Sequence, residues 1–226
     1  MINLITIRGE RRSGTNWLQK ILKHTNCTID INYKFGWKHG FFEPIHYNQY
    51  HNSDLIIVLF KDVYSWLLSL NDDPKHMPWA KEINFSKFVR HEYYSIADVP
   101  WFVDNCNLKK GDELREYNLD GIRFKNIIQL RNAKYRDWLN IRNRIENVEY
   151  ILYDDLLKNP DKLTERLRVK YKIESKPLKL RHFEKKQFYL NKEYMRDISK
   201  QDKDFIDSQI DSKLEQEINL ICKGEE

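Results

Sequence analysis

The order of hydrophobic and polar positions along this chain predicts strands and helices in alternation. Four short segments have the length of strands, namely Leu4–Ile7, Tyr33–Lys38 (closed by Gly40 and Pro44), Leu55–Phe60 and Val148–Tyr153. The run over 55–60 is continuous, which is typical of a strand covered on both faces within a parallel sheet. Strands that alternate with helices predict an α/β domain of three layers, with a mostly parallel central sheet flanked by helices.

Apolar residues at helical spacing predict the helices that connect these strands. One helix begins near Thr15, a second follows the strand over 55–60, and residues 126–144 are mainly helical. Asp154-Asp155 is expected to cap a helix that carries Leu156, Leu157, Leu163 and Leu167. Towards residue 226 an amphipathic stripe is formed by Ile206, Ile210, Leu214, Ile218 and Ile221, and we interpret this stripe as packing.

Residues 71–125 are the least regular part of the chain. Three prolines interrupt this stretch, and aromatic residues cluster between Trp79 and Phe102. One helix is predicted near Phe85–Tyr94. Long irregular segments within compact domains usually serve as lids or binding loops. We therefore expect a single domain over 1–226, with an acceptor-binding or lid insert at about 71–125.

Composition narrows the functional classes. The length of 226 residues suits one domain, and the 13% aromatic content argues against disorder. The net charge of +5 comes without Lys/Arg runs that interleave with aromatic residues, so no nucleic-acid partner is expected. No segment approaches the ~20 apolar residues of a membrane span. The three cysteines form no CxxC pair, which favours a reducing, cytoplasmic location and predicts neither disulfides nor a bound metal.

A glycine-containing turn between the first strand and the first helix has the spacing of a phosphate loop. Gly9 and Gly14 bracket it, and the N–H groups at the start of a helix, together with the helix dipole, favour an anion there. A nucleotide triphosphatase would read GxxxxGK[ST], but Thr15 stands in the place of that lysine and the basic residue comes earlier, at Arg12. The turn therefore predicts phosphate binding without the usual lysine contact to ATP.

The same segment resembles the 5′-phosphosulfate loop of sulfotransferases that use 3′-phosphoadenosine-5′-phosphosulfate (PAPS). That loop reads roughly (K/R)SGT(T/N)WL, and here it stands as Arg12-Ser13-Gly14-Thr15-Asn16-Trp17-Leu18. A second element is the basic residue after a buried strand with a serine eight positions later, here Lys61 and Ser69, although Lys61-Asp62-Val63 replaces the more common Arg-Asn-Pro. A third is Tyr153-Asp154-Asp155-Leu156, followed by Asn159-Pro160. The resemblance runs from residue 4 to about 170, and the late RKGxxG segment of many members is not recognisable, although Lys185 and Lys186 lie there.

The resemblance implies a P-loop-type nucleotide fold, PAPS as co-substrate, adenosine 3′,5′-bisphosphate as product, and roles for particular residues. The residues implied to bind the co-substrate are Arg11, Arg12, Ser13, Gly14, Thr15, Asn16, Trp17, Lys61 and Ser69. Among them, Arg12 would also stabilise the leaving group, while Lys61 and Ser69 would hold the 3′-phosphate. His39, in Gly36-Trp37-Lys38-His39-Gly40, occupies the family's position for the catalytic base, and a histidine suits that role because it titrates near neutral pH. Glu43 is the alternative base and Glu10 a weaker candidate.

The expected activity is transfer of a sulfuryl group from PAPS to an acceptor hydroxyl or amine. The acceptor would be a small molecule or a saccharide that stacks on the aromatic insert. Two alternatives stay open. One is a P-loop kinase using ATP and magnesium, since Asp154-Asp155 after an apolar strand resembles a Walker B pair. The other is a protein that binds a nucleotide without catalysis, because a fold does not establish an activity.

Overall fold

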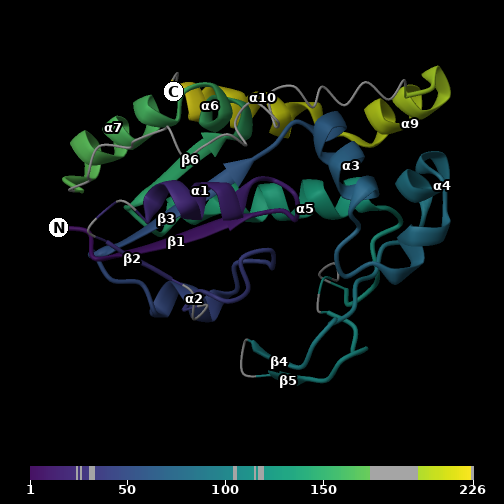
Figure 1. Cartoon of the computed structure of the whole chain (residues 1–226), viewed down its shortest axis with the longest axis horizontal. Coiled ribbons are helices and arrows are strands. Elements are labelled where there is room, and N and C mark those ends of the chain that lie inside the picture. The colour runs from purple at the N-terminus through teal and green to yellow at the C-terminus, as the bar shows by residue number, and fades with distance from the viewer. Residues whose placement is uncertain are drawn as a thin grey trace.

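The centre of the molecule is a parallel sheet of four strands (Figure 1). The computed structural model describes residues 1–23, 25, 27–30, 34–103, 106–114, 116, 120–173 and 198–224. The strands lie in the order β2 (Thr28–Ile29), β1 (Leu4–Gly9), β3 (Asp54–Phe60) and β6 (Val148–Leu152). Every pair in this sheet is parallel, so the strands end at a common edge.

Helices cover both faces of the sheet, which makes a three-layer α/β arrangement as predicted. On one face, Leu18, Leu156 and Leu163 of α1 (Thr15–Leu22), α6 (Tyr153–Lys158) and α7 (Pro160–Tyr171) pack on inward-facing residues of β1 and β3. On the other face, α5 (Ile127–Leu139) and α10 (Ser212–Lys223) contribute Trp138 and Ile218. All seven residues of β3 are buried, which confirms the strand covered on both faces.

Most of the predicted elements are confirmed, with two helices divided. The strands at residues 4, 55 and 148, the helix starting at Thr15, α3 (Val63–Asp72) and α5 are present, and η2 (Asn140–Asn143) continues α5. The predicted helix over 154–167 splits at Asn159, because Pro160 lacks an N–H and suits the first turn of a new helix. Asp154 and Asp155 lie within the first turn of α6, and its cap is Leu152, so the predicted Asp cap is wrong.

The C-terminal stripe belongs to two helices rather than one. They are α9 (Lys200–Gln209) and α10, and the side chain of Asp211 caps α10 by accepting the N–H of Leu214 at 3.2 Å. Ile206 joins the core formed with α3 and α4, whereas Leu214 and Ile218 pack against the sheet. The interpretation of this stripe as packing is confirmed.

The strand predicted at Tyr33–Lys38 is wrong over its described residues, 34–38, which form turns. Tyr33 itself lies outside the described residues, and the short strand β2 at Thr28–Ile29 pairs with β1 instead. The physical reason is the buried guanidinium of Arg8. It donates to the carbonyl oxygens of Phe35 and Trp37 (3.3 Å) within this segment, and to those of Gly40 (2.8 Å) and Phe41 (3.0 Å) just after it. Carbonyls that converge on one guanidinium curl the chain around it.

The insert over 71–125 is more ordered than its composition predicts. It contains η1 (Pro78–Glu82), the predicted helix as α4 (Phe85–Arg90), and an unpredicted antiparallel hairpin of β4 (Trp101–Val103) and β5 (Cys106–Leu108). Phe88 and Val89 of α4 pack with α3 and α5, whereas the hairpin projects away from the sheet (Figure 1). A short helix, α2 (Pro44–Asn48), lies on the other side of the sheet from α7 in the same view. None of the helices in the described part of the chain is long and apolar enough to cross a membrane.

Candidate anion site at the carboxyl edge of the sheet

Three chain segments meet where β1, β3 and β6 end. Gly9 pairs with Leu59 and Phe60 with Leu152, so the phosphate-like loop, Lys61 and Tyr153 all leave the sheet at the same level. In open α/β sheets, ligands bind at this edge. The fold therefore brings together two motifs that the sequence analysis associated with the co-substrate, which lie 49 residues apart at Lys61 and Arg12.

The loop is a tight turn that requires glycine at position 14. Gly14 has φ 94 and stands at the N-terminus of α1, where its carbonyl accepts the N–H groups of Trp17 at 2.9 Å and Leu18 at 3.0 Å. The Ser13 hydroxyl and N–H both donate to the Glu10 carbonyl, at 2.6 and 3.1 Å. The first N–H groups of a helix have no partner within that helix, so this geometry suits an anion.

Tyr153 packs directly on this loop. A Cβ atom at Gly14 would lie 2.4 Å from the Tyr153 ring, so the close approach is a second reason for glycine there. The ammonium group of Lys61 lies 4.7 Å from the centre of the same ring and donates to the Arg12 carbonyl at 3.2 Å. Tyr153 belongs to the Tyr153-Asp154-Asp155-Leu156 motif, but the motif predicted no role for it. Its position immediately after a buried strand was the signal that placed it at this edge.

Lys61 is a buried cation, and hydrogen bonds to its backbone groups fix its position. Its side chain is only 4% exposed. The Tyr135 hydroxyl accepts its N–H at 3.2 Å, and Arg131 donates to its carbonyl at 3.0 Å. Burial, followed by the nearby charge of Arg12, lowers the pKa of Lys61 to about 8, against the opposing effect of Asp154 and Asp62. An anion bound beside this ammonium would restore the stabilisation that burial removes.

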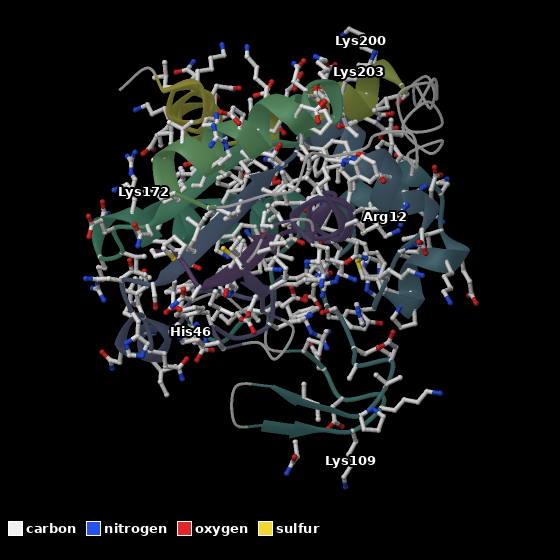
Figure 2. All side chains as sticks on the ribbon, turned by 60° about the vertical axis from the view of Figure 1, so that its left-hand side comes forward. Arg12, His46, Lys109, Lys172, Lys200 and Lys203 are labelled. Carbon is white, nitrogen blue, oxygen red and sulfur yellow. The ribbon has the colours of Figure 1, made fainter. Side chains whose placement is uncertain are left out.

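The two adjacent arginines of the loop have different surroundings. Arg12 is one-third exposed and forms an ion pair with Asp73 at 2.9 Å. Figure 2 shows it beside α1, far from Lys109 of the hairpin. Arg11 is buried, stacks on Trp37 at 4.6 Å, and donates to both carboxylate oxygens of Glu116, at 3.0 and 2.6 Å. Burial alone would lower the pKa of Arg11, but the charge and hydrogen bonds of Glu116, with Tyr93 and Glu10, together outweigh burial and raise the pKa.

His39 lies against the end of β1 in the protonation form that a general base needs. Its Nδ1 is 2.5 Å from the Gly9 carbonyl oxygen. Because a carbonyl can only accept, Nδ1 carries the hydrogen and Nε2 keeps its lone pair. Burial, then the charges of Lys38 and Arg11, lower the pKa of His39 well below 6.5, so the ring is neutral at pH 7. His39 belongs to a turn and not to a strand end, yet the Gly9 N–H bond to the Lys38 carbonyl, 3.1 Å, brings it to this edge.

The remaining predicted site residues differ in their burial and contacts. Asn16 is exposed, and its side-chain oxygen accepts from the Lys38 ammonium at 2.7 Å. Thr15 and Ser69 are buried, and Trp17 packs against the core on the α1 face. Glu43 is exposed at the start of α2, and Glu10 is buried and ion-paired with Lys134 at 2.7 Å. Lys185 and Lys186 lie outside the described residues.

A buried cluster of acidic and basic side chains next to the loop was not predicted from the sequence. Lys134 and Arg131 occupy inward positions of α5 that lie at helical spacing with Leu130 and Trp138. Basic residues on the core side of a helix indicate buried acidic partners, and this was the available signal. The partners of Lys134, Glu10 and Glu116, are far apart in the sequence, and Arg131 pairs instead with Glu215. In the described part of the chain no three His, Cys, Asp or Glu residues gather as metal ligands.

The fold and the site define an α/β protein with a candidate anion site at the carboxyl edge of a parallel sheet. Comparisons of this chain with protein-family models, curated proteins and solved structures found no match. The functional proposal therefore rests on the loop motif and on the geometry of this edge.

Proposed function

We propose that this protein is a cytoplasmic PAPS-dependent sulfotransferase built on a P-loop-type nucleotide domain. The observation that carries the proposal is the contact between the Lys61 ammonium and the Arg12 carbonyl, 3.2 Å. It joins a buried cation to a phosphate loop in which Thr15 replaces the lysine of ATP-binding loops. A second basic group beside such a loop suits a nucleotide with two separate anionic ends, as PAPS has.

Each end of the co-substrate would have its own group of residues. The N–H groups from Ser13 to Asn16 and the Arg12 guanidinium would hold the 5′-phosphosulfate. Lys61 would bind the 3′-phosphate, with Ser69 of α3 as the second contact that the motif implies. In the free protein Arg12 pairs with Asp73, which also contacts Lys75 at 3.1 Å, so Arg12 would exchange this carboxylate for the co-substrate.

The reaction would be an in-line displacement at sulfur. A lone pair of the acceptor hydroxyl or amine attacks the sulfur atom, and the bond from sulfur to the bridging oxygen of the 5′-phosphate breaks. The acceptor proton passes to Nε2 of His39, and the electron pair of the broken bond stays on the 5′-phosphate of adenosine 3′,5′-bisphosphate. Arg12 would stabilise the charge that grows on that oxygen, a contribution that acts mainly in the transition state.

The acceptor would approach from the side of the insert. Trp37 links the two regions, because the rings of His39 and of His76 each meet it edge-on, at 5.3 and 5.8 Å between centroids. His76 belongs to the insert and His39 to the site. A small hydroxyl compound or a saccharide is the first class of acceptor to test.

Nucleotide binding separates this proposal from its alternatives. We expect adenosine 3′,5′-bisphosphate to bind about 10- to 150-fold more tightly than ADP or AMP, the range for one charge-assisted phosphate contact. Binding should need no magnesium. Calorimetry with and without magnesium would measure both. Equal affinity for AMP, or a strict requirement for magnesium, would favour the kinase. Tight binding of the bisphosphate without transfer from PAPS to any acceptor would favour a protein that only binds nucleotide.

A further inference from the structure

A cluster of buried charges lies directly beneath the candidate anion site. Glu116 is its centre, and it accepts hydrogen bonds from Arg11, from Tyr93 at 2.8 Å, from Ser95 and from Lys134. Lys134 also pairs with Glu10 at 2.7 Å. Each of these side chains is almost wholly buried. The two carboxylates balance the two cations, and removing one member of such a cluster is destabilising because it leaves a buried charge without its partner.

This cluster connects three segments that are distant in the sequence. Glu10 and Arg11 belong to the loop, Tyr93, Ser95 and Glu116 belong to the insert, and Lys134 belongs to α5. Glu116 and Arg11 are 105 residues apart. The insert is thus attached to the loop by a bidentate ion pair.

The loop residue that follows this attachment is strained. Arg12 has φ 66, a left-handed conformation that is unfavourable for a residue with a side chain and persists only where its surroundings hold it. Arg11 is fixed on both sides: Glu116 holds its guanidinium, and the Trp66 ring N–H donates to its carbonyl at 2.8 Å. Lys61 holds the Arg12 carbonyl. Loss of the Arg11 anchor would allow Arg12 and the following N–H groups to relax.

We infer that Glu116 of the insert is a positioning residue for the phosphate loop. Glu116 acts through Arg11, because their ion pair fixes the Arg11 side chain in the interior. Arg12 is then the loop cation that would face the co-substrate. The insert is therefore part of the nucleotide site as well as a candidate acceptor region. The consequence for nucleotide affinity rests on the proposed function, whereas the consequence for loop order does not.

The test compares two buried glutamates, each of which pairs with two cations. Glu149 is 5% exposed and contacts Arg166, Lys170 and the Tyr171 hydroxyl, but it lies near the start of β6, at the opposite edge of the sheet. Glu116→Gln should speed hydrogen exchange in peptides covering residues 10–16 of the free protein and weaken adenosine 3′,5′-bisphosphate binding about tenfold. Glu149→Gln should change neither quantity, even where it lowers thermal stability.

Paired variants separate positioning from charge balance. Glu116→Gln combined with Lys134→Met leaves the cluster with one cation and one carboxylate and so keeps it neutral, and Glu149→Gln with Lys170→Met likewise leaves the net charge of its own group unchanged. We expect the first pair to be as stable as the second while keeping fast loop exchange and weakened binding. If Glu116→Gln alone does not fold, the Glu116→Gln/Lys134→Met variant still allows loop exchange and nucleotide binding to be measured.

Two results would contradict the positioning role of Glu116, and a third would contradict the proposed function without affecting that role. Loop exchange at the wild-type rate in the neutral Glu116 pair would show that Glu116 only balances charge. An equal loss of affinity in the Glu149 variants would show that the effect is general destabilisation. Failure of the wild-type protein to bind the bisphosphate, with fast loop exchange still confined to the Glu116 variants, would overturn the proposed function and leave the positioning role intact.

Discussion

The two ends of strand β3 place buried charges in opposite situations. At the amino end, Asp54 is 3% exposed and its carboxylate accepts the Lys34 ammonium at 2.6 Å and the His51 N–H at 2.8 Å. At the carboxyl end, Lys61 is equally buried, but its ammonium contacts a carbonyl oxygen and an aromatic ring. Burial lowers its pKa to about 8.

This difference distinguishes a charge that supports the fold from one that suits a ligand. The Asp54 carboxylate pairs with a cation of the protein and accepts a backbone N–H, which gives it a structural role. The folded state disfavours the charged form of Lys61, and an anion arriving at that edge would reverse the balance. A buried group with a perturbed pKa at an edge where loops gather is a reasonable candidate for function.

The largest expected effect is on the rate of sulfuryl transfer. It should follow substitution of His39 at the carboxyl edge of the sheet but not substitution of His51 at the amino edge. His39→Asn should lower the rate by ~10²–10⁴-fold, the range for a general base, while nucleotide binding and folding persist. Because the pKa of His39 lies well below 6.5, wild-type kcat/KM should fall only at more acidic pH, through an ionisation that the variant lacks.

The control for this prediction is at the other end of β3. His51→Asn changes an exposed side chain beside Asp54 and should leave the rate unaltered. Near-wild-type activity of His39→Asn with a known acceptor would contradict the assignment of the base. Glu43→Gln would then be the next variant to measure.

The second prediction contrasts the two lysines. Lys61→Met should weaken adenosine 3′,5′-bisphosphate binding by about 10- to 150-fold through loss of a charge-assisted contact. The variant should be at least as stable as the wild type, because it removes a charge that burial disfavours. Lys34→Met should have the reverse effects, with unchanged binding and a loss of about 2 kcal/mol, since it leaves the Asp54 carboxylate without its ammonium. Calorimetry and denaturant unfolding measure the two quantities, and a stability loss in Lys61→Met would contradict this account.

The smallest effect concerns pH. Phosphate binding favours the ammonium form of Lys61, so the complex should take up protons near pH 8, and affinity should fall by at most about tenfold per pH unit above pH 8. Between pH 8 and the ordinary value of 10.5, the unfolded chain holds more protons at this group than the folded one, so the group raises the free energy of unfolding as pH rises. Affinity in Lys61→Met should be insensitive to pH over this range, and a parallel pH dependence in both proteins would show that another group titrates.

Much of the α/β fold could be predicted, because its strands and helices follow from the local pattern of apolar residues and glycines. The continuous apolar run at 55–60 specifies the buried strand β3. The turn between Gly9 and Gly14 marks the end of β1 at the carboxyl edge of the sheet. The prediction failed at residues 34–38, where the backbone wraps around Arg8, and at Asn159–Pro160, where one expected helix became two. A buried guanidinium that gathers carbonyls leaves no periodic trace in the sequence.

By itself, the sequence determined the strand–loop–helix order, the absence of the ATP-loop lysine, and the presence of cations after two strands. Only the tertiary structure decided which of these cations are buried and which carboxylates pair with them. Arg11 and Arg12 are neighbours of identical chemistry, yet Arg11 is buried and pairs with Glu116, 105 residues away, whereas Arg12 is one-third exposed and pairs with Asp73. The physical reason is that burial and charge pairing depend on contacts between distant segments, which local patterning does not encode.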